Sequence, residues 1–155
     1  CHLVQQLIRL GTTVYLVETC SGDRFLRDVS ARTGVPIILA HVPILMGGAV
    51  LANARLLVSG RYHPSILAAL GGTPSIFLGS NSHKTRSLQK VLEYDVVKEF
   101  SAVPSREESV QIGCLAKDIL EKGQSIRGKI KTVSARRCEE TMQILDVIRD
   151  GVLPT

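Results

Sequence analysis

The sequence predicts an α/β fold, in which a parallel sheet carries helices on both faces and is followed by C-terminal helices. The 155 residues fit one ordinary domain, and 45% of them are hydrophobic, which is enough for a sizeable core. Only 4% are aromatic and none is Trp, so the core must consist of the Val, Ile, Leu and Ala typical of buried parallel strands. Short apolar runs alternate with helical patterns, and this alternation requires right-handed crossovers and a parallel sheet.

Glycine and proline mark the boundaries of the predicted elements. Gly11 and Gly34 are placed to end helices, while Pro36 and Pro74 open short apolar strands, where a missing N–H is tolerated. The predicted elements are a helix over 2–10, a strand over 13–17, a helix that ends near residue 34, a strand over 37–40, a helix over 44–53, a strand over 55–59, a helix from residue 64 to 72, a strand over 75–78, a helix over 84–94 and an edge strand at 96–97.

The tail has a different pattern, with apolar residues at steps of three and four that predict two amphipathic helices over 106–122 and 132–149. We therefore expect one Rossmann-like domain over 1–155, with an α/β core over 1–100 and C-terminal helices over 105–149. Because the chain opens at Cys1 without Met, we expect it to be the C-terminal domain of a larger two-domain protein, whose N-terminal domain would be its partner.

Charge and cysteine content narrow the classes of function. The net charge is +5, and five cations gather near the C-terminus without aromatic residues between them: Arg127, Lys129, Lys131, Arg136 and Arg137. Sites for single-stranded nucleic acid usually interleave stacking rings with such cations, so we expect no nucleic acid but a solvated helix face or one that meets an acidic neighbouring domain.

The four cysteines form no CxxC pair and no spacing that suits a metal, which indicates reduced thiols, a cytoplasmic location and no metal site. Two uncharged stretches, 33–54 and 62–82, are interrupted by Gly and Pro. They therefore indicate buried strands and helices, and we expect no transmembrane segment.

In a parallel sheet, ligands bind where the carboxyl ends of strands lead into helices. This rule selects four turns, at 20–23, 40–43, 59–63 and 79–84. In the third, Pro64 suits the first helical position, which would place His63 at the N-cap and Arg61 just before it. The helix N-terminus favours an anion, Arg61 adds a fork for carboxylate or phosphate, and His63 adds a group that moves a proton near neutral pH.

The fourth turn supplies small residues, Ser80, Asn81 and Ser82, that let a ligand approach the backbone, and then Lys84 in the first turn of a helix. The positive end of the helix dipole repels a lysine there unless an anion binds to it. We therefore interpret this turn as a second set of donors for the same ligand. Ser21 of the first turn completes the predicted binding set. The alternative is that Arg61 and His63 only cap a loop while Lys84 points to water.

The run GRYHPSILAALGGTPSIFLGSNSHKT, residues 60–85, resembles the polysaccharide pyruvyl transferase family. Its Arg-x-His signature, its Gly-x-Pro strand and its loop lysine fall on Arg61, His63, Gly72, Pro74 and Lys84. The resemblance implies the C-terminal Rossmann-type half of an enzyme that is similar in architecture to B-type glycosyltransferases. The family's other half, expected to help bind the acceptor and to supply an acidic group, has no counterpart in this sequence.

The resemblance further implies a transferase that moves a pyruvyl group from phosphoenolpyruvate onto a sugar of a cell-envelope polysaccharide as a ketal. Phosphoenolpyruvate would be the donor substrate, a saccharide the acceptor, and no cofactor would be required. Arg61 would clamp the donor's carboxylate or phosphate, His63 would be the acid or base, and Lys84 with Ser80 to Ser82 would stabilise the departing phosphate. Without its other half, such a domain is expected to be inactive.

Two other functions remain open on the sequence. The helix and Gly-x-Pro strand also look like half of a B-type glycosyltransferase or of a UDP-sugar epimerase, which would bind a nucleoside diphosphate at the same strand ends. A non-catalytic domain kept for assembly would instead use 106–149 as its contact surface. In either case an exposed apolar stripe on the last helix favours a homo-oligomer.

Overall fold

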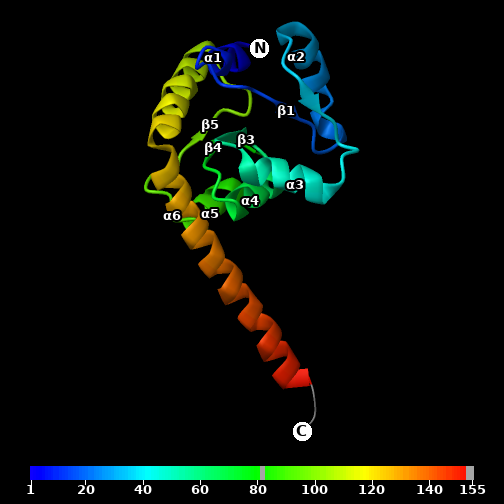
Figure 1. Ribbon diagram of the computed structural model, residues 1–155, viewed down its shortest axis with the longest axis vertical. Helices are drawn as coiled ribbons and strands as arrows, with labels where there is room; N and C mark the ends of the chain where they lie inside the picture. Colours follow the sequence, from blue (N-terminus) through cyan, green and yellow to red (C-terminus); the bar gives the residue numbers. More distant parts are fainter. Residues whose placement is uncertain (81–82, 153–155) are drawn as a thin grey trace.

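The computed structural model describes residues 1–80 and 83–152, which form an α/β body from which one long C-terminal helix projects (Figure 1). Its elements are α1 (His2–Ile8), β1 (Leu16–Val17), the 3₁₀ turn η1 (Ser21–Asp23), α2 (Phe25–Thr33), β2 (Ile37–Ile38), α3 (Ile44–Asn53), β3 (Leu57–Ser59), α4 (Tyr62–Leu70), β4 (Ser75–Leu78), α5 (Lys84–Val91), β5 (Glu99–Phe100) and α6 (Arg106–Val152).

All five strands pair in parallel, so the predicted α/β class with a parallel, Rossmann-like arrangement is confirmed. The strands form two small sheets where one continuous sheet was expected. One sheet pairs β1 with β2, and the other has the order β3-β4-β5.

The core lies on both faces of the larger sheet, as predicted. Successive side chains of a strand point to opposite faces, and β4 shows this directly with Ile76 and Phe77. Phe77 packs with residues of α4 and α5, and also with Ile130 of α6. Ile76 packs on the other face with Ile112 and Ala116 of α6, against partly buried residues of α1.

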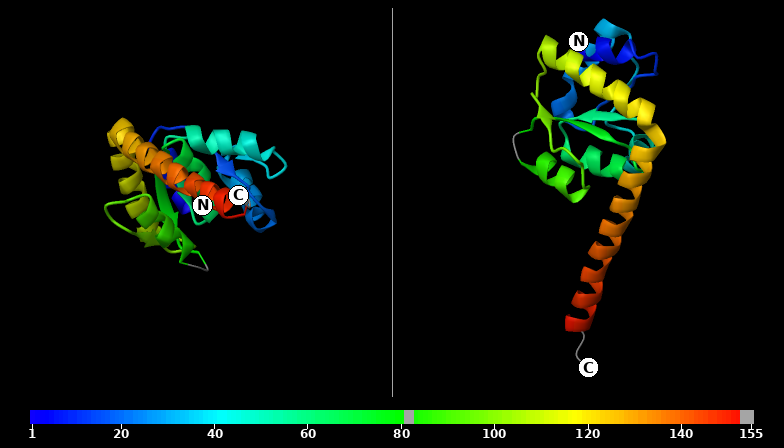
Figure 2. Two further views of the ribbon diagram at one scale, coloured as in Figure 1. Left: turned by 90° about the horizontal axis from the view of Figure 1, so that it is seen from below. Right: turned by 90° about the vertical axis from the view of Figure 1, so that its left-hand side faces the viewer.

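The C-terminal region is one helix of 47 residues, so the prediction of two helices was wrong. The stretch between them contains Gly123 and Gly128 but no proline, and a glycine costs a helix only about 1 kcal/mol. Ile126 and Ile130 in this stretch pack against the core, which offsets that cost. Figure 2 shows that α6 changes direction where its colour passes from yellow to orange, beyond which it leaves the body.

The basic cluster near the C-terminus fastens α6 to the body, which corrects its interpretation as a merely solvated face. Arg127 donates to the carbonyl oxygens of Ala52 and Ala54 at the end of α3. Lys129 forms an ion pair of 2.6 Å with Asp95 in the loop after α5.

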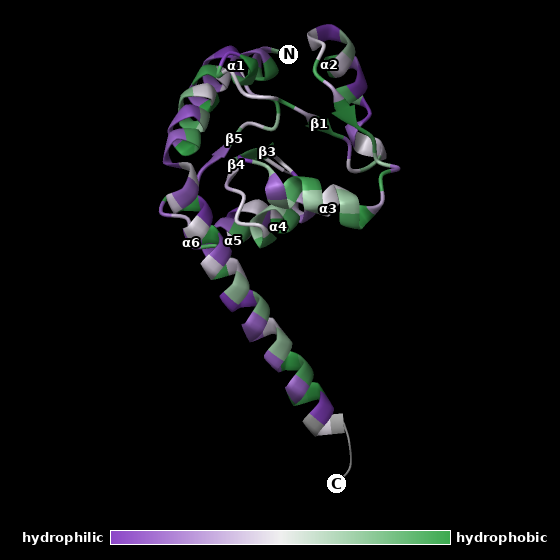
Figure 3. Ribbon diagram, viewed as in Figure 1, coloured by the Kyte–Doolittle hydropathy of each residue, from purple (hydrophilic) through white to green (hydrophobic). Residues whose placement is uncertain are grey.

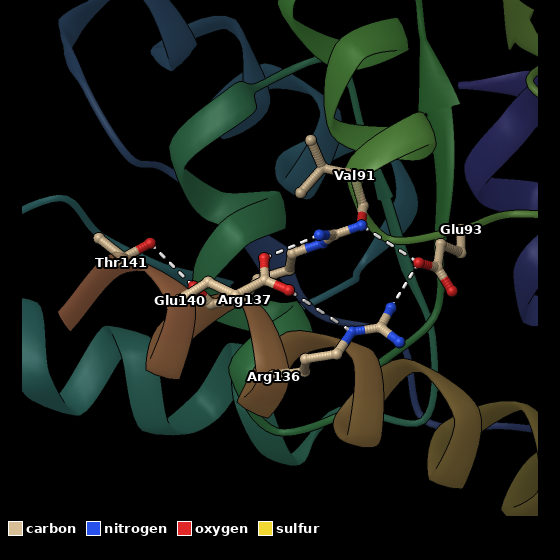
Figure 4. Close-up of polar contacts among 6 residues, drawn as sticks. All are labelled: Val91, Glu93, Arg136, Arg137, Glu140 and Thr141. Atoms are coloured by element: carbon tan, nitrogen blue, oxygen red, sulfur yellow. Dashed lines mark hydrogen bonds and ion pairs between the residues drawn. The ribbon is translucent and has the colours of Figure 1, made fainter. Parts of the chain in front are cut away.

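Further along α6, Arg136 and Arg137 both bind the carboxylate of Glu93, just after α5 (Figure 4). Arg137 also donates from Nε to the carbonyl oxygen of Val91 at 3.2 Å. Glu93 has a φ of 55°, a left-handed conformation that turns the chain after α5. These contacts hold α6 against the loop that leads to β5.

The last predicted strand was misplaced. Val96 and Val97 are exposed, and β5 lies three residues further along, where Glu99 and Phe100 pair with β4. The side chain of Gln89 accepts a hydrogen bond from the backbone N–H of Lys98 at 2.9 Å, which fixes the entry into the strand. Across the described residues, no helix is long and apolar enough to span a bilayer.

Candidate functional site

The first and third predicted turns follow β1 and β3, at the carboxyl ends of these strands. Ligands of α/β proteins bind at such strand ends. The turn η1 follows β1 and begins with Ser21, which is exposed. Arg61 follows β3 and is the N-cap residue of α4. The structure therefore brings the first and third predicted turns together.

The contact between the two turns is an ion pair between Arg61 and Asp23. Nε and Nη2 of Arg61 donate to Oδ1 of Asp23 at 3.1 and 2.6 Å. The other carboxylate oxygen, Oδ2, accepts from the backbone N–H and the hydroxyl of Thr19 at 3.0 and 2.6 Å. It also accepts from the N–H of Cys20 at 3.3 Å. Asp23 is only 5% exposed, whereas the side chain of Arg61 is 49% exposed.

Both partners of this ion pair are held in their charged forms. Burial raises the pKa of Asp23, but hydrogen bonds from Thr19 and Arg61 outweigh it, and the net pKa lies below 3.8. The hydrogen bond to Asp23 raises the pKa of Arg61 above its usual range. Both shifts favour the charged form of the ion pair.

The role of Asp23 was not found from the sequence. It lies 38 residues from Arg61, and an aspartate in a turn ordinarily caps the following helix. A second buried carboxylate behaves in the same way: Glu18, which is 4% exposed, accepts from Nε and Nη2 of Arg27 at 2.8 and 3.0 Å. The hydrogen bond from Arg27 is the main cause of the lowered pKa of Glu18.

His63 lies inside the first turn of α4, which corrects its prediction as the N-cap. The helix begins at Tyr62, and Pro64 is its third residue. A proline fits there because the first N–H groups of a helix have no partner within it. The hydroxyl of Ser65 donates to the carbonyl oxygen of Arg61 at 2.8 Å and fixes this turn. The imidazole is exposed and meets the ring of Tyr62 edge-on at 5.5 Å between centroids.

The loops after β3 and β4 lie in near contact. A Cβ built on Gly60 would be 3.1 Å from the carbonyl oxygen of Gly79, so a side chain there would require the loop after β4 to shift. Beyond Gly79, Ser80 is exposed, and Lys84 is the exposed first residue of α5. The predicted residues Asn81 and Ser82 lie outside the described part of the chain.

The structure brings the first predicted turn to the third and the third to the fourth, but it is Asp23 that Arg61 contacts. Within residues 1–80 and 83–152, no hydrogen bond or ion pair joins Arg61 to His63 or to Lys84. The four cysteines are free and exposed, and no metal-binding cluster occurs among the described residues. The arrangement provides one oriented guanidinium at the N-cap of α4, an exposed histidine in the first turn of α4 and an exposed lysine in the first turn of α5.

Comparison with known proteins identifies the family of this segment. Residues 6–82 match the family model described as polysaccharide pyruvyl transferase. No curated protein and no solved structure matches the chain. The matched segment runs from α1 to the loop after β4, and it includes Ser21, Arg61 and His63. Through residues 6–82, the chain belongs to the polysaccharide pyruvyl transferase family, a family of transferases.

Proposed function

We propose that this chain carries the donor-binding side of a pyruvyl transferase site, which acts on phosphoenolpyruvate and on a sugar of a cell-envelope polysaccharide. The observation that carries the proposal is the half-exposed guanidinium of Arg61, held by a buried carboxylate at the start of α4. The family to which residues 6–82 belong supports the reaction class. The four free cysteines favour a reducing compartment, so we place the reaction in the cytoplasm.

The donor carries a phosphate and a carboxylate, and both need hydrogen-bond donors with positive charge. Arg61 offers a planar fork that suits either group, and the N-terminus of α4 adds free N–H groups and the positive end of its dipole. Ser21 lies on the facing turn η1 and is accessible to the same ligand. We assign the recognition of one anionic group of the donor to these residues.

His63 is the proposed general acid. The reaction needs a proton on the methylene carbon of phosphoenolpyruvate, which turns the enol carbon into an oxocarbenium-like centre. One sugar hydroxyl adds to that centre and releases its proton. A second hydroxyl then displaces inorganic phosphate and releases another proton, which completes the ketal. The exposed imidazole of His63, two residues after Arg61, suits the first proton transfer.

Lys84 is the proposed stabiliser of the departing phosphate. It is the first residue of α5, where the positive end of the helix dipole repels a cation. A bound anion would offset this repulsion. Ser80, which precedes it in the same loop, would contribute its backbone. The parts assigned to Asn81 and Ser82 rest on the sequence alone.

The test of His63 is the His63→Ala variant in the full chain. Loss of a general acid should lower turnover of phosphoenolpyruvate by about 10² to 10⁴. His2→Ala removes an exposed histidine of α1 and is the matched control, with wild-type turnover expected. Wild-type turnover by His63→Ala would remove this residue from the mechanism.

The choice of donor is tested by binding. A ligand that binds only the folded state raises the melting temperature, by an amount equivalent to about 2.7 kcal/mol at a hundredfold excess over Kd. Phosphoenolpyruvate should therefore stabilise the protein, and Arg61→Gln should reduce the effect. Stabilisation by uridine diphosphate alone would contradict the proposal and favour a glycosyltransferase or an epimerase. If neither ligand shifts the melting temperature, the non-catalytic alternative stands.

A further inference from the structure

We infer that Asp23 and Gly22 position Arg61: Asp23 fills one edge of its guanidinium, Gly22 leaves the guanidinium the room to lie there, and a ligand meets the other edge. This inference rests on the proposed function, because the ligand is the anionic group of the donor. Neither residue belongs to the Arg-x-His segment that carries the family resemblance. Both come from η1, after β1, and they approach Arg61 from the other sheet.

The hydrogen bonds define which donors of Arg61 are used. Oδ1 of Asp23 accepts from both Nε and Nη2, so the side edge of the guanidinium faces the carboxylate. Of the five N–H donors of an arginine, both on Nη1 and the second on Nη2 are then left. These form the end fork, which matches two oxygens of a carboxylate or a phosphate.

Asp23 is a firm support because its own position is fixed. Its second oxygen accepts four hydrogen bonds, two from Thr19 and two from Cys20, and its side chain is buried. A rotation of the carboxylate would take a buried charged oxygen away from those donors, which is costly. The guanidinium is therefore held by a carboxylate whose own orientation is fixed.

Gly22 leaves room for the guanidinium on a second side. A Cβ built at this position would lie 3.0 Å from Nη2 of Arg61, closer than ordinary van der Waals contact. The backbone of Gly22 is not in the left-handed region, so alanine is compatible with its conformation. Gly22→Ala thus requires the guanidinium to shift by a few tenths of an ångström, while the carboxylate of Asp23 and its hydrogen bonds from Thr19 and Cys20 are left in place.

The ion pair also determines what the ligand must provide. Asp23 neutralises the charge of Arg61. The site therefore selects a planar anion more by the geometry of the end fork of Arg61 than by charge. Lysine has no second edge, so it cannot bind the carboxylate and a bidentate ligand at once. Arg61→Lys should consequently behave like Arg61→Gln in the affinity for the donor.

The decisive experiment compares four variants of the full chain in the transferase reaction. Gly22→Ala should raise KM for phosphoenolpyruvate about 3- to 10-fold, since small displacements at a positioned group have large effects. Asp23→Asn should raise KM by at least as much. Gly47→Ala adds the same methyl group where nothing lies within 4 Å, and Glu18→Gln alters the other buried carboxylate; both should keep the wild-type KM.

A double-mutant cycle shows whether the effect passes through Arg61. In an Arg61→Gln background, Gly22→Ala should no longer change KM. A melting temperature equal to the wild-type value identifies Gly22→Ala as folded, so the test stands even if Asp23→Asn does not fold. If folded Gly22→Ala keeps the wild-type KM while Arg61→Gln raises it, the positioning role is wrong and the proposed function survives.

A measurement that needs no substrate distinguishes the positioning of Arg61 from the proposed function. The Nε–H proton of Arg61, followed by nuclear magnetic resonance, should exchange slowly in the wild type and faster in Gly22→Ala, but not in Gly47→Ala. Rapid exchange in the wild type would overturn the inference whatever the donor is. Slow exchange together with unchanged phosphoenolpyruvate kinetics in Arg61→Gln would instead overturn the proposed function and leave Asp23 as the partner of Arg61.

Discussion

At the scale of single residues, two buried carboxylates after β1 each fix an arginine. Asp23 holds Arg61, and Glu18 holds Arg27 of α2. Burying a carboxylate is costly unless it is paired and hydrogen-bonded, and both of these are. Removing Asp23 leaves Arg61 and the N–H groups of Thr19 and Cys20 without this acceptor, whereas removing Glu18 affects only its ion pair with Arg27.

The stability of the protein should therefore fall in acid. The folded-state pKa of Asp23 lies below 3.8 and that of Glu18 below 4.5. A carboxylate with a lowered folded-state pKa stabilises the fold above its unfolded pKa, and this contribution is lost as the pH falls through the folded value. We expect the free energy of unfolding, measured with urea, to decrease steadily as the pH is lowered from about 5 to 2.

Asp23→Asn should flatten this curve, by up to about 1.4 kcal/mol per pH unit, which is the contribution of one proton. Asp28→Asn removes an exposed carboxylate from α2 and controls for the lost charge. An equal change of slope in both variants would show that net charge, and not the ion pair with Arg61, produces the acid dependence.

Residues near a strand end could be located from the sequence, but their partners could not. The rule that ligands bind at the carboxyl ends of parallel strands was enough to select Arg61, His63 and Lys84. Asp23 comes from a distant turn, and only the three-dimensional arrangement of the two sheets brings it to Arg61. In the sequence, an aspartate in a turn is interpreted as the cap of the following helix, so its pairing with a distant arginine is not recognised.

At the scale of elements, boundaries with a local cause were predictable. Gly34 is the C-cap residue of α2 with a φ of 72°, the left-handed conformation that ends a helix, whereas α1 ends at Ile8, two residues before the predicted end. The helix over 44–53 and the strand over 75–78 were predicted with their observed bounds. The continuity of α6 was not predictable, because it depends on Arg127 and Ile130 contacting distant parts of the body.

The start of α6 has a local cause of its own, a capping box between Ser105 and Glu108. The N–H of Glu108 donates to the hydroxyl of Ser105 at 3.1 Å, and the N–H of Ser105 donates back to the carboxylate at 3.0 Å. Glu108 also accepts two hydrogen bonds from Ser101. Backbone hydrogen bonds from Ser101 and Ser105 are the main causes of its lowered pKa.

Ser105→Ala should lower the free energy of unfolding by about 1 kcal/mol, the usual loss when an N-cap hydroxyl is removed. Urea denaturation at neutral pH measures it. Glu107→Gln, which changes an exposed acid in the same turn, should stay within about 0.5 kcal/mol of the wild type. Equal stability of Ser105→Ala and the wild type would mean that the packing of Ile112 alone fixes the start of α6.

At the scale of the whole molecule, the site edge and the projecting helix are separate features. The α/β class followed from composition and alternation, but the division into two sheets did not, since strands of two to four residues leave no signal of their neighbours. Figure 3 shows hydrophobic residues along α3 and again near the end of α6. Five apolar side chains there are exposed: Met142, Ile144, Leu145, Val147 and Ile148.

Removal of residues 141–152 should leave the stability of the body unchanged while reducing self-association. Side chains 138–149 are exposed, and the final contacts of α6 with the body are those of Arg136 and Arg137 with Glu93 and Val91. The shortened chain should therefore keep the wild-type melting temperature. An exposed apolar stripe favours association, so light scattering should show a mass that rises with concentration only for the complete helix.

Point substitutions distinguish the effect of the exposed apolar side chains on association from the effect of shortening the helix. Ile144→Lys together with Leu145→Lys should give the same loss of association as the truncation, because both side chains are more than half exposed and lie on one side of the final turns. Gln143→Lys adds a charge to the same stretch and should leave association intact. A complete chain that stays monomeric at high concentration would contradict a homo-oligomer formed through α6, and it would leave the fold and the anion site as they are.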